Sequence, residues 1–195
     1  MAARAISSLF VISGFSFLSL SSASSEPTVV ISVPEQKLAI MENGSSVAEF
    51  PVSTSKFGLG DKPRSYATPI GTLVIAGKVG AGAKPGTVFK ACRPTGEVIR
   101  PNAPGRDPIV TRILRLKGLQ ANNARAYRRG IYIHGTPQEN RIGRPASYGC
   151  IRMRSRDVVR VFDAVPVGTK VEIVNTSLSR VVREAAHEKE LATRG

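Results

Sequence analysis

The sequence predicts one mainly β domain with one or two helices. The chain has 195 residues, of which 42% are hydrophobic, so it is long enough to bury a core that needs no disulfide or metal support. Short runs rich in β-branched residues recur along it, and Gly, Pro, Asn and Asp separate these runs. Apolar residues at helical spacing occur in only two segments near the C-terminus. No internal repeat or change of composition indicates a second domain.

Nine runs are predicted as strands because they combine β propensity with flanking turn signals. Residues 57–69 have no periodicity and are predicted to form a loop. The glycine-rich residues 77–86 do not favour a phosphate-binding loop, because Lys78 precedes Val rather than Ser or Thr and Pro85 follows. We interpret them as a flexible hairpin or a loop at the rim of a substrate site. The predicted strands are residues 29–33, 37–41, 47–52, 72–76, 88–91, 97–100, 109–116, 131–134 and 170–174.

Two helices are predicted close to the C-terminus. Ser155 is suited to cap the N-terminus of the first helix, with Asp157 in its first turn, and Pro166 ends it. The second helix is predicted over residues 178–191, where charges of both signs alternate, so residues 176–195 are interpreted as a charged helical tail. The apolar face of the first helix consists of Val158, Val161, Phe162 and Val165.

The first 24 residues are predicted to be a signal peptide. A positive charge at Arg4 precedes an apolar run over residues 6–20, and small residues follow, with cleavage expected between Ala23 and Ser25. The run of 15 residues is shorter than the about 20 that a membrane span needs, so an anchor is not favoured. We therefore expect an exported protein of the periplasm or cell envelope whose mature form does not insert stably into the membrane.

The net charge of +14 is unevenly placed. Residues 100–160 contain fourteen Lys and Arg against three acidic residues. A basic surface attracts polyanions, but the chain has no Trp, shows no nucleic-acid motif and begins with a leader, so we predict no nucleic-acid partner. Acidic cell-envelope material fits better, and a solvated basic face that only keeps the protein soluble remains an alternative.

A histidine and a cysteine, His134 and Cys150, are the strongest candidates for catalysis. A thiol is a weak nucleophile until a base removes its proton, and His134 is suited to that role at neutral pH. It ends a predicted strand, whereas the other histidine, His187, lies in the charged tail. Zinc would need three or four ligands and this pair supplies two, so we predict no metal and no cofactor.

The residues around Cys150 are suited to acyl chemistry. Ser147, Tyr148 and Gly149 are predicted to form a tight turn whose backbone N–H groups stabilise an oxyanion. Arg152 would share a face with Cys150 if the segment is extended, where it could hold a substrate carboxylate or lower the thiol pKa. The alternative for Arg152 is an ordinary salt bridge, for example with Asp157.

Cys92 offers an alternative explanation for Cys150, because the two cysteines could form a disulfide in an oxidising compartment. A domain of this size does not need the bridge, and only Cys150 lies in a Gly-Cys-Ile-Arg context. We therefore predict a free Cys92 and a reactive Cys150.

These motifs resemble the L,D-transpeptidase family with the YkuD-type catalytic domain, whose signature is His-Gly, a spacer, and Ser-His-Gly-Cys before an apolar residue and Arg or Asn. Stretches at residues 31–40, 50–55, 66–72 and 167–173 are also similar, so the resemblance covers residues 28–175. Tyr148 replaces the commoner histidine, which leaves His134 as the base. We expect this change to alter the substrate rim more than the chemistry, and Tyr148 could supply a hydroxyl to the site.

The resemblance implies a β-sandwich-like domain of mixed sheets that remodels peptidoglycan as a monomer, with stem peptides as donor and acceptor. Cys150, deprotonated by His134, would attack the carbonyl of the third residue of a tetrapeptide stem, an L-centred diamino acid, and expel D-Ala. An amine would resolve the thioester into a 3→3 cross-link. The N–H groups of residues 148–150 would hold the oxyanion, Arg152 and Ser147 would orient substrate or shape the loop, and the Gly135 carbonyl would fix the His134 tautomer.

Four alternatives are considered from the sequence. Water could resolve the same thioester, giving an L,D-carboxypeptidase, or a protein lysine could accept the acyl group. A sortase-like transpeptidase also combines His, Cys and Arg, but the spacing of sixteen residues and an Arg two residues after the Cys argue against it. A non-catalytic cell-wall-binding module with a structural disulfide is the alternative from a different class.

Overall fold

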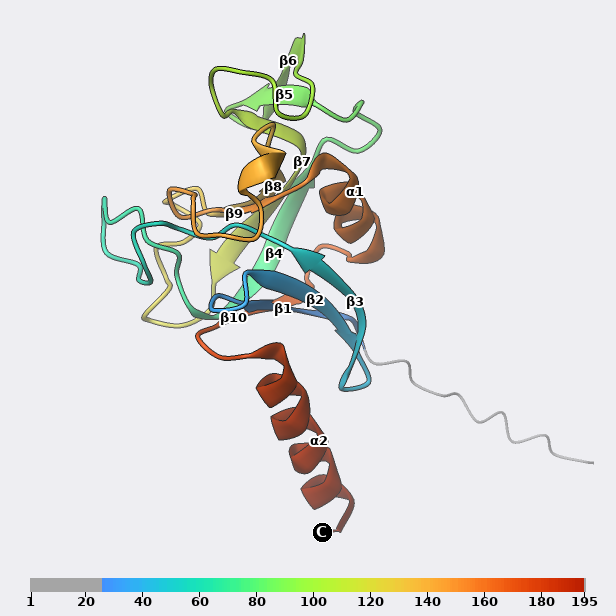
Figure 1. Cartoon of the computed structure of the whole chain (residues 1–195). Helices are drawn as coiled ribbons and strands as arrows, with labels where there is room; N and C mark the ends of the chain where they lie inside the picture. The colour runs from blue at the N-terminus through green and yellow to red at the C-terminus, as the bar shows by residue number, and fades with distance from the viewer. Residues whose placement is uncertain (1–25, 195) are drawn as a thin grey trace, which may run out of the picture.

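The computed structural model describes residues 26–194, and the predicted signal peptide lies outside them. The described part contains ten strands and two α-helices, so the mainly β, mixed fold class is confirmed (Figure 1). The elements are β1 Thr28–Ser32, β2 Lys37–Glu42, β3 Ser45–Pro51, β4 Gly71–Val79, β5 Thr87–Lys90, β6 Arg93–Val98, β7 Ile109–Gly118, β8 Tyr132–Gly135, β9 Ile151–Met153, α1 Ser155–Ala164, β10 Lys170–Val174 and α2 Leu178–Arg194.

All ten described strands belong to one mixed sheet. Its main order is β3-β2-β1-β10-β4-β7-β5-β6, and β8 and β9 branch from β7. The pairs β1–β10 and β8–β9 are parallel, and the other pairs are antiparallel. Strand β7 is ten residues long and pairs with β4, β5 and β8, so it connects the main sheet to the branch that carries His134.

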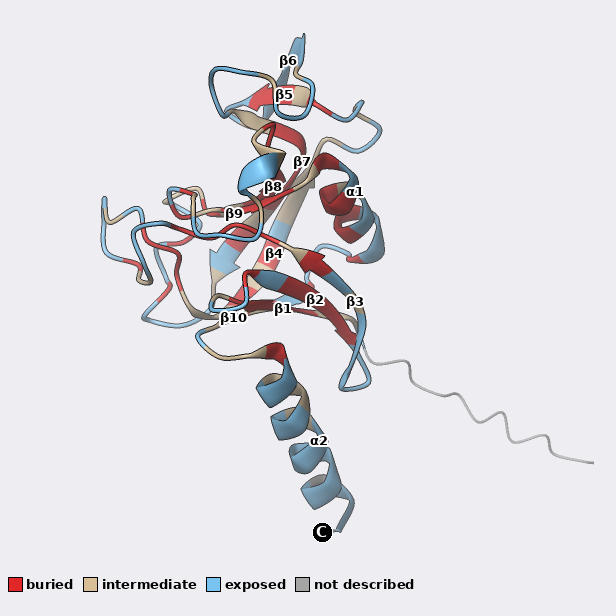
Figure 2. Ribbon diagram, viewed as in Figure 1, coloured by how far each residue is buried: buried red, intermediate tan, exposed pale blue. Residues whose placement is uncertain are grey.

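The core lies between the strands and α1, whose apolar face is the predicted one (Figure 2). Val158 and Val161 are fully buried against strand residues such as Leu114, and burial of each such side chain contributes roughly 1.5–3 kcal/mol. Lys78 Nζ donates to the carbonyl oxygens of Phe162 and Val165 at the end of α1. A cation at a helix C-terminus is favourable, so this contact holds α1 against β4.

The second helix, α2, contacts the body mainly through its first turns. Leu178 joins a small buried cluster with Val30, Ala39 and Met41, and the rest of the helix projects away from the sheet (Figures 1 and 2). The helix begins at the predicted residue and ends at Arg194, three residues beyond the prediction. Within the described residues, no helix is long and apolar enough to cross a membrane.

Three local features differ from what the sequence predicted or were missed by it. Ser155 is the first residue of α1 rather than its cap; Arg154 occupies the cap position without a side-chain cap bond, and the N–H of Ser155 donates to Glu139 Oε1 at 2.8 Å. Strand β9 was not predicted, because three residues carry too little periodicity. The glycine-rich segment begins inside β4, and none of residues 77–86 lines the cavity at Cys150.

Candidate active site

A cavity of about 160 Å³ brings His134 and Cys150 together. Strands β8 and β9 are parallel, with His134 paired to Arg152, and Cys150 directly precedes β9. This pairing places two segments sixteen residues apart side by side. Gly135 and Gly149 are chain neighbours of the lining residues. The cavity is lined by Asp107, Ile109, His134, Ser147, Tyr148, Cys150 and Arg152.

His134 is buried and held in one tautomer. Its Nδ1 lies 2.8 Å from the carbonyl oxygen of Gly135, and because a carbonyl only accepts, Nδ1 carries the proton. Nε2 therefore keeps its lone pair. Burial lowers the pKa of His134 to about 4, although the Gly135 hydrogen bond and Asp107 act in the opposite direction. The imidazole is neutral at pH 7 and can accept a proton.

Cys150 is half-buried at the same cavity and is protonated at neutral pH. Its Sγ lies 3.3 Å from the carbonyl oxygen of Gly130. Burial raises the pKa of the Cys150 thiol to about 11, and the Tyr132 backbone, Arg129 and Arg152 lower it by less. Arg152 thus acts in the predicted direction, but desolvation is the larger effect. The resting site is a neutral thiol beside a neutral imidazole.

Alkylation of Cys150 is expected to follow the titration of this thiol. Because only the thiolate reacts, the rate with iodoacetamide should rise about tenfold per pH unit above pH 7 and level off only near pH 11. The measurement uses Cys92→Ala protein, in which Cys150 is the one remaining cysteine. A rate that is already maximal between pH 5 and 7 would indicate a thiolate–imidazolium pair and contradict this state.

The turn before Cys150 is fixed by Ser147. Its Oγ donates to the carbonyl oxygen of Cys150 at 2.6 Å and accepts the N–H of Gly149 at 3.1 Å. The prediction that residues 148–150 all supply oxyanion donors therefore needs correction, because the Gly149 N–H is engaged. The N–H groups of Tyr148 and Cys150 form no hydrogen bond within residues 26–194. These two are the candidate oxyanion donors.

Gly149 is required for a close approach as well as for its backbone angle. It has φ +117°, and a Cβ there would lie 3.1 Å from Ile131 Cδ1 and 3.2 Å from the carbonyl oxygen of Ala67. Thr68 Oγ1 also donates to the Gly149 carbonyl at 3.0 Å, so the turn is held from two sides.

Gly149→Ala is expected to destabilise the protein by about 1–3 kcal/mol and to displace Cys150. Gly143→Ala is the matched control, because Gly143 also has positive φ but a Cβ there meets no atom within 4 Å. Urea unfolding of both variants separates the backbone strain from the clash. Equal losses of unfolding free energy would show that the contacts at Gly149 do not matter.

Arg152 forms a salt bridge, and its partner is Asp107 rather than Asp157, the example that the salt-bridge alternative named. Arg152 Nη1 donates to Asp107 Oδ2, and the Arg152 side chain is only 5% exposed. Asp107 Oδ1 also accepts from Thr136 Oγ1, while Asp157 pairs with Arg156 at 3.3 Å. Nε and Nη2 of Arg152 are buried and have no hydrogen-bond partner among the described residues. Buried guanidinium donors of this kind are suited to an anionic group that enters the cavity.

Asp107, which lines the cavity and pairs with Arg152, was not among the residues that the sequence pointed to. It is the one acidic residue between Arg100 and Leu116, and that isolation was the available signal.

Both cysteines are free, so the alternative of a structural disulfide is wrong. Cys92 lies in the turn between β5 and β6, and its Sγ is 3.8 Å from the hydroxyl oxygen of Tyr132. The non-catalytic wall-binding alternative depended on that bridge and loses its support.

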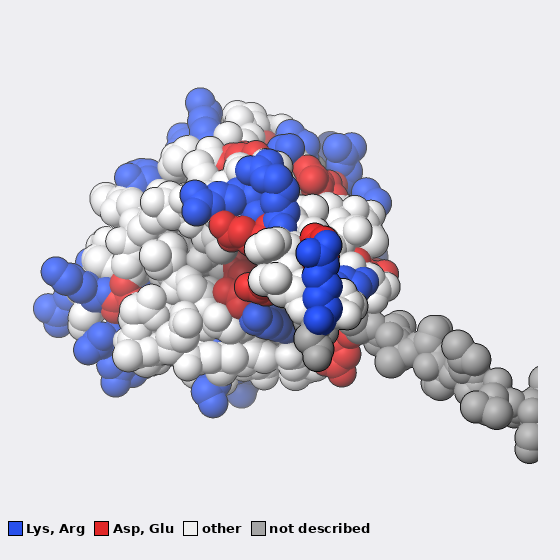
Figure 3. All heavy atoms as spheres, turned by 90° about the horizontal axis from the view of Figure 1, so that it is seen from below, with Lys and Arg blue, Asp and Glu red and all other residues white. Residues whose placement is uncertain are grey.

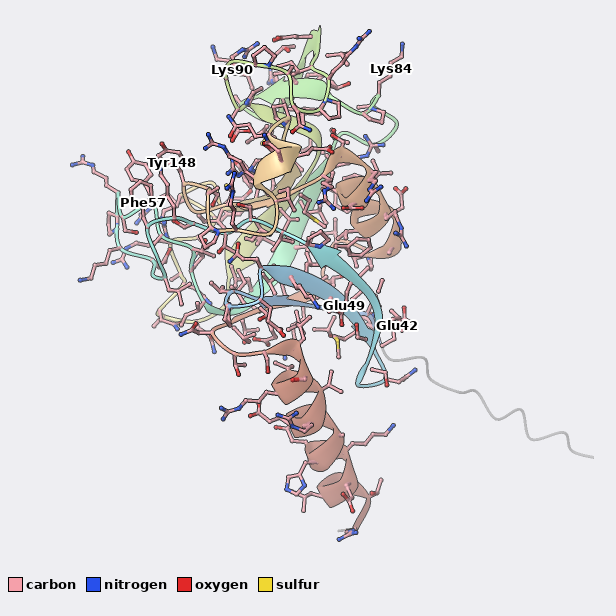
Figure 4. All side chains as sticks on the ribbon, in the orientation of Figure 1. Glu42, Glu49, Phe57, Lys84, Lys90 and Tyr148 are labelled. Carbon is pink, nitrogen blue, oxygen red and sulfur yellow. The ribbon has the colours of Figure 1, made fainter. Side chains whose placement is uncertain are left out.

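Tyr148 lies at the outer rim of the cavity, with 61% of its surface exposed. Its hydroxyl accepts a hydrogen bond from Lys56 Nζ at 3.2 Å, and its ring contacts those of Phe57 and Tyr66. Figure 4 shows Tyr148 and Phe57 side by side at the edge of the molecule. The Tyr148 hydroxyl thus accepts a hydrogen bond from Lys56, and the Tyr148 side chain lines the cavity.

The face seen from below carries both basic and acidic side chains (Figure 3). Lys and Arg side chains lie over the middle of this face as well as at its edge, and acidic side chains lie among them (Figure 3).

Fold and cavity together define a mainly β domain in which a cysteine and a histidine line the same cavity. Residues 26–173 match the YkuD L,D-transpeptidase catalytic domain, and the chain therefore belongs to this family.

Curated relatives match over short stretches. The chain is 47% identical over 47 residues to YqjB of Bacillus subtilis, whose name assigns it to the L,D-transpeptidases; this covers 24% of the chain and 27% of YqjB. It is 51% identical over 43 residues to ErfK/SrfK of Salmonella typhimurium, also named as an L,D-transpeptidase, covering 22% of the chain and 14% of that protein. Each match thus spans about a quarter or less of the relative.

Solved structures show the same fold. An L,D-transpeptidase from Xylanimonas cellulosilytica superposes with a TM-score of 0.50 at 21% identity, covering 78% of this chain and 62% of that one. Bd1075 of Bdellovibrio bacteriovorus gives 0.51 at 16% identity, covering 88% and 57%.

Proposed function

We propose that this protein is an exported L,D-transpeptidase that cleaves the bond between the L-centred diamino acid and D-Ala in peptidoglycan tetrapeptide stems. The acyl group then passes through a Cys150 thioester to an amine, giving 3→3 cross-links. The observation that carries this proposal is the tautomer of His134. The Gly135 carbonyl holds the proton on Nδ1, which leaves Nε2 as a base in the cavity that Cys150 lines.

Acylation starts from the neutral pair. Because the pKa values keep the proton on sulfur, its transfer to His134 Nε2 accompanies the attack of Cys150 Sγ on the stem carbonyl. The resulting oxyanion is placed near the N–H groups of Tyr148 and Cys150. The C–N bond then breaks, His134 returns its proton to the departing amine of D-Ala, and the thioester remains.

Arg152 and Asp107 have different tasks in this reaction. Asp107 neutralises and positions Arg152, and its charge raises the pKa of His134, so it stabilises the imidazolium that forms during attack. The free Nε and Nη2 donors of Arg152 bind a carboxylate of the stem peptide. Ser147 holds the turn before Cys150 in position for proton transfer and for carboxylate binding.

Resolution of the thioester needs a nucleophile that has lost a proton. An amine attacks the carbonyl, the C–S bond breaks, and His134 passes the amine proton to the Cys150 thiolate. Water would follow the same route and give a tripeptide, and a protein lysine would give a protein conjugate.

Purified protein incubated with tetrapeptide muropeptides tests this function, with products identified by mass spectrometry. We expect dimers that have lost one D-Ala, and none with Cys150→Ala protein. Tripeptides alone would assign a carboxypeptidase. Unchanged muropeptides with free D-Ala absent would contradict the proposed chemistry.

Export is tested separately. The protein recovered from the cell envelope fraction is expected to begin between residues 24 and 26, as determined by N-terminal sequencing. A chain that still begins at Met1 would contradict cleavage.

A further inference from the structure

Three aromatic rings from separate loop positions meet at the mouth of the cavity. The ring centroids of Phe57, Tyr66 and Tyr148 lie 5.4–5.8 Å apart, and we call this cluster the aromatic cage. The three residues are 49%, 53% and 61% exposed, respectively. Aromatic rings that only stabilise loops contribute most free energy when other side chains bury them. Half-exposed rings in mutual contact therefore indicate a binding surface.

A primary ammonium group of the chain already lies against two rings of the cage. Lys56 Nζ lies 4.6 Å from the ring centroid of Tyr148 and 5.2 Å from that of Phe57, within the range of cation–π attraction. It also donates to the Tyr148 hydroxyl at 3.2 Å. The cage therefore holds an ammonium group supplied by the chain itself.

The rings are held in place by the backbone that also fixes the catalytic turn. Ser55 Oγ donates to the carbonyl oxygen of Tyr66 at 2.5 Å and accepts the N–H of Phe57 at 2.9 Å. The N–H of Lys56 donates to the carbonyl oxygen of Ser147 at 3.2 Å. Tyr66 has φ +54°, a left-handed conformation that a tyrosine adopts only when its surroundings impose it. The cage is thus preorganised relative to Cys150.

The position of the cage matches the second half of the reaction. Tyr148 lines the cavity that contains His134 and Cys150, so the cage is continuous with the place where the thioester forms. The acyl acceptor must bring an amine to that place. The side-chain amine of a diamino acid is a primary ammonium at neutral pH, chemically the same group as Lys56 Nζ.

We propose that the aromatic cage binds the ammonium group of the acyl acceptor and that Lys56 is an internal competitor for it, an inference that rests on the proposed transfer to an amine. The acceptor displaces the Lys56 ammonium from the rings. As it moves inward it releases one proton to water, and its nitrogen then attacks the thioester carbonyl. The C–N bond forms as the C–S bond breaks, and the second proton passes through His134 to the Cys150 thiolate.

Two matched inhibitors test the charge dependence. Both are acceptor tripeptides in which the side-chain amine is replaced, by trimethylammonium in one and by a neutral tert-butyl group in the other. Neither can attack the thioester. The charged analogue should inhibit transfer in competition with the acceptor at concentrations at least about threefold lower than the neutral one. Equal inhibition would overturn the proposal, because shape alone would then explain binding.

Three variants test the residues. Lys56→Met should lower the inhibition constant of the charged analogue about threefold and leave that of the neutral analogue unchanged, because the competitor is gone. Phe57→Leu should raise the inhibition constant of the charged analogue at least about threefold. Lys62→Met is the control, since Lys62 is an exposed lysine in the same loop. If Lys56→Met and Lys62→Met behave alike, Lys56 does not occupy the acceptor site and the proposal fails.

Three further measurements separate the outcomes. N-acetylglucosamine oligomers that inhibit wild-type protein but not Phe57→Leu would assign the rings to sugar binding and overturn the ammonium site. Thioester formation with the donor is measured independently for each variant. If no thioester forms even in wild-type protein, the proposed function fails. Calorimetric binding of the two analogues to Cys150→Ala protein then still decides whether the cage prefers the charged group.

Discussion

Replacing Cys150 by alanine is expected to abolish release of D-Ala from tetrapeptide stems, by at least about 10³-fold, because no other residue of the cavity supplies a comparable nucleophile. His134→Ala should lower the rate by about 10²–10⁴-fold, since the thiol then lacks its base while its pKa of about 11 keeps it protonated. The measurement is D-Ala release under conditions that saturate the enzyme.

Cys92→Ala is the control for this prediction. Cys92 is free and outside the cavity lining, so the variant should keep most of the activity. If Cys150→Ala protein kept full activity, or if only Cys92→Ala protein lost its activity, Cys92 would be the nucleophile. Either result would contradict the proposed site.

The second large effect is expected at Asp107. Asp107→Ala leaves the Arg152 guanidinium, with 5% of its side chain exposed, without its counter-ion. Breaking one side of such a pair costs about 3–5 kcal/mol, and because 23% of the Asp107 side chain is exposed we expect about 3 kcal/mol of unfolding free energy. Activity should fall as well, since Arg152 loses its position and His134 loses a favourable charge.

A double-mutant cycle separates the two consequences. Adding Arg152→Met to Asp107→Ala removes the unpaired charge, so urea unfolding should show recovery of most of the lost stability. Activity should stay low, because no donor remains for the substrate carboxylate. Additive losses of stability in the double variant would show that the two side chains do not act as a pair. Recovery of activity would contradict the role of Arg152.

Local patterns predicted most of the fold. Strands such as β2 and β10 have alternating or continuous apolar runs bounded by turn residues, and α1 shows its buried face at helical spacing. Its first residue was misjudged because the group that satisfies the Ser155 N–H is Glu139, which lies sixteen residues earlier. A cap supplied through tertiary structure leaves no local signal.

The candidate site was predictable where its residues lie close together in the sequence. His134 is conspicuous because the chain has only two histidines, and Cys150 carries a specific motif. Its isolation among basic residues was the one signal for Asp107, and its partner was not predictable, because the contact with Arg152 depends on the pairing of β7, β8 and β9. Phe57 and Tyr66 lie in an aperiodic loop, and only the folded chain brings them to Tyr148.

The thioester itself provides the most direct measurement. Protein mixed with a tetrapeptide stem is quenched in acid, digested and mapped by mass spectrometry. The proposed mechanism predicts a tripeptide acyl group on the peptide that contains Cys150, an unmodified Cys92 and one released D-Ala for each acyl group. Release of D-Ala while Cys150 remains a free thiol, or an acyl group on another residue, would contradict it.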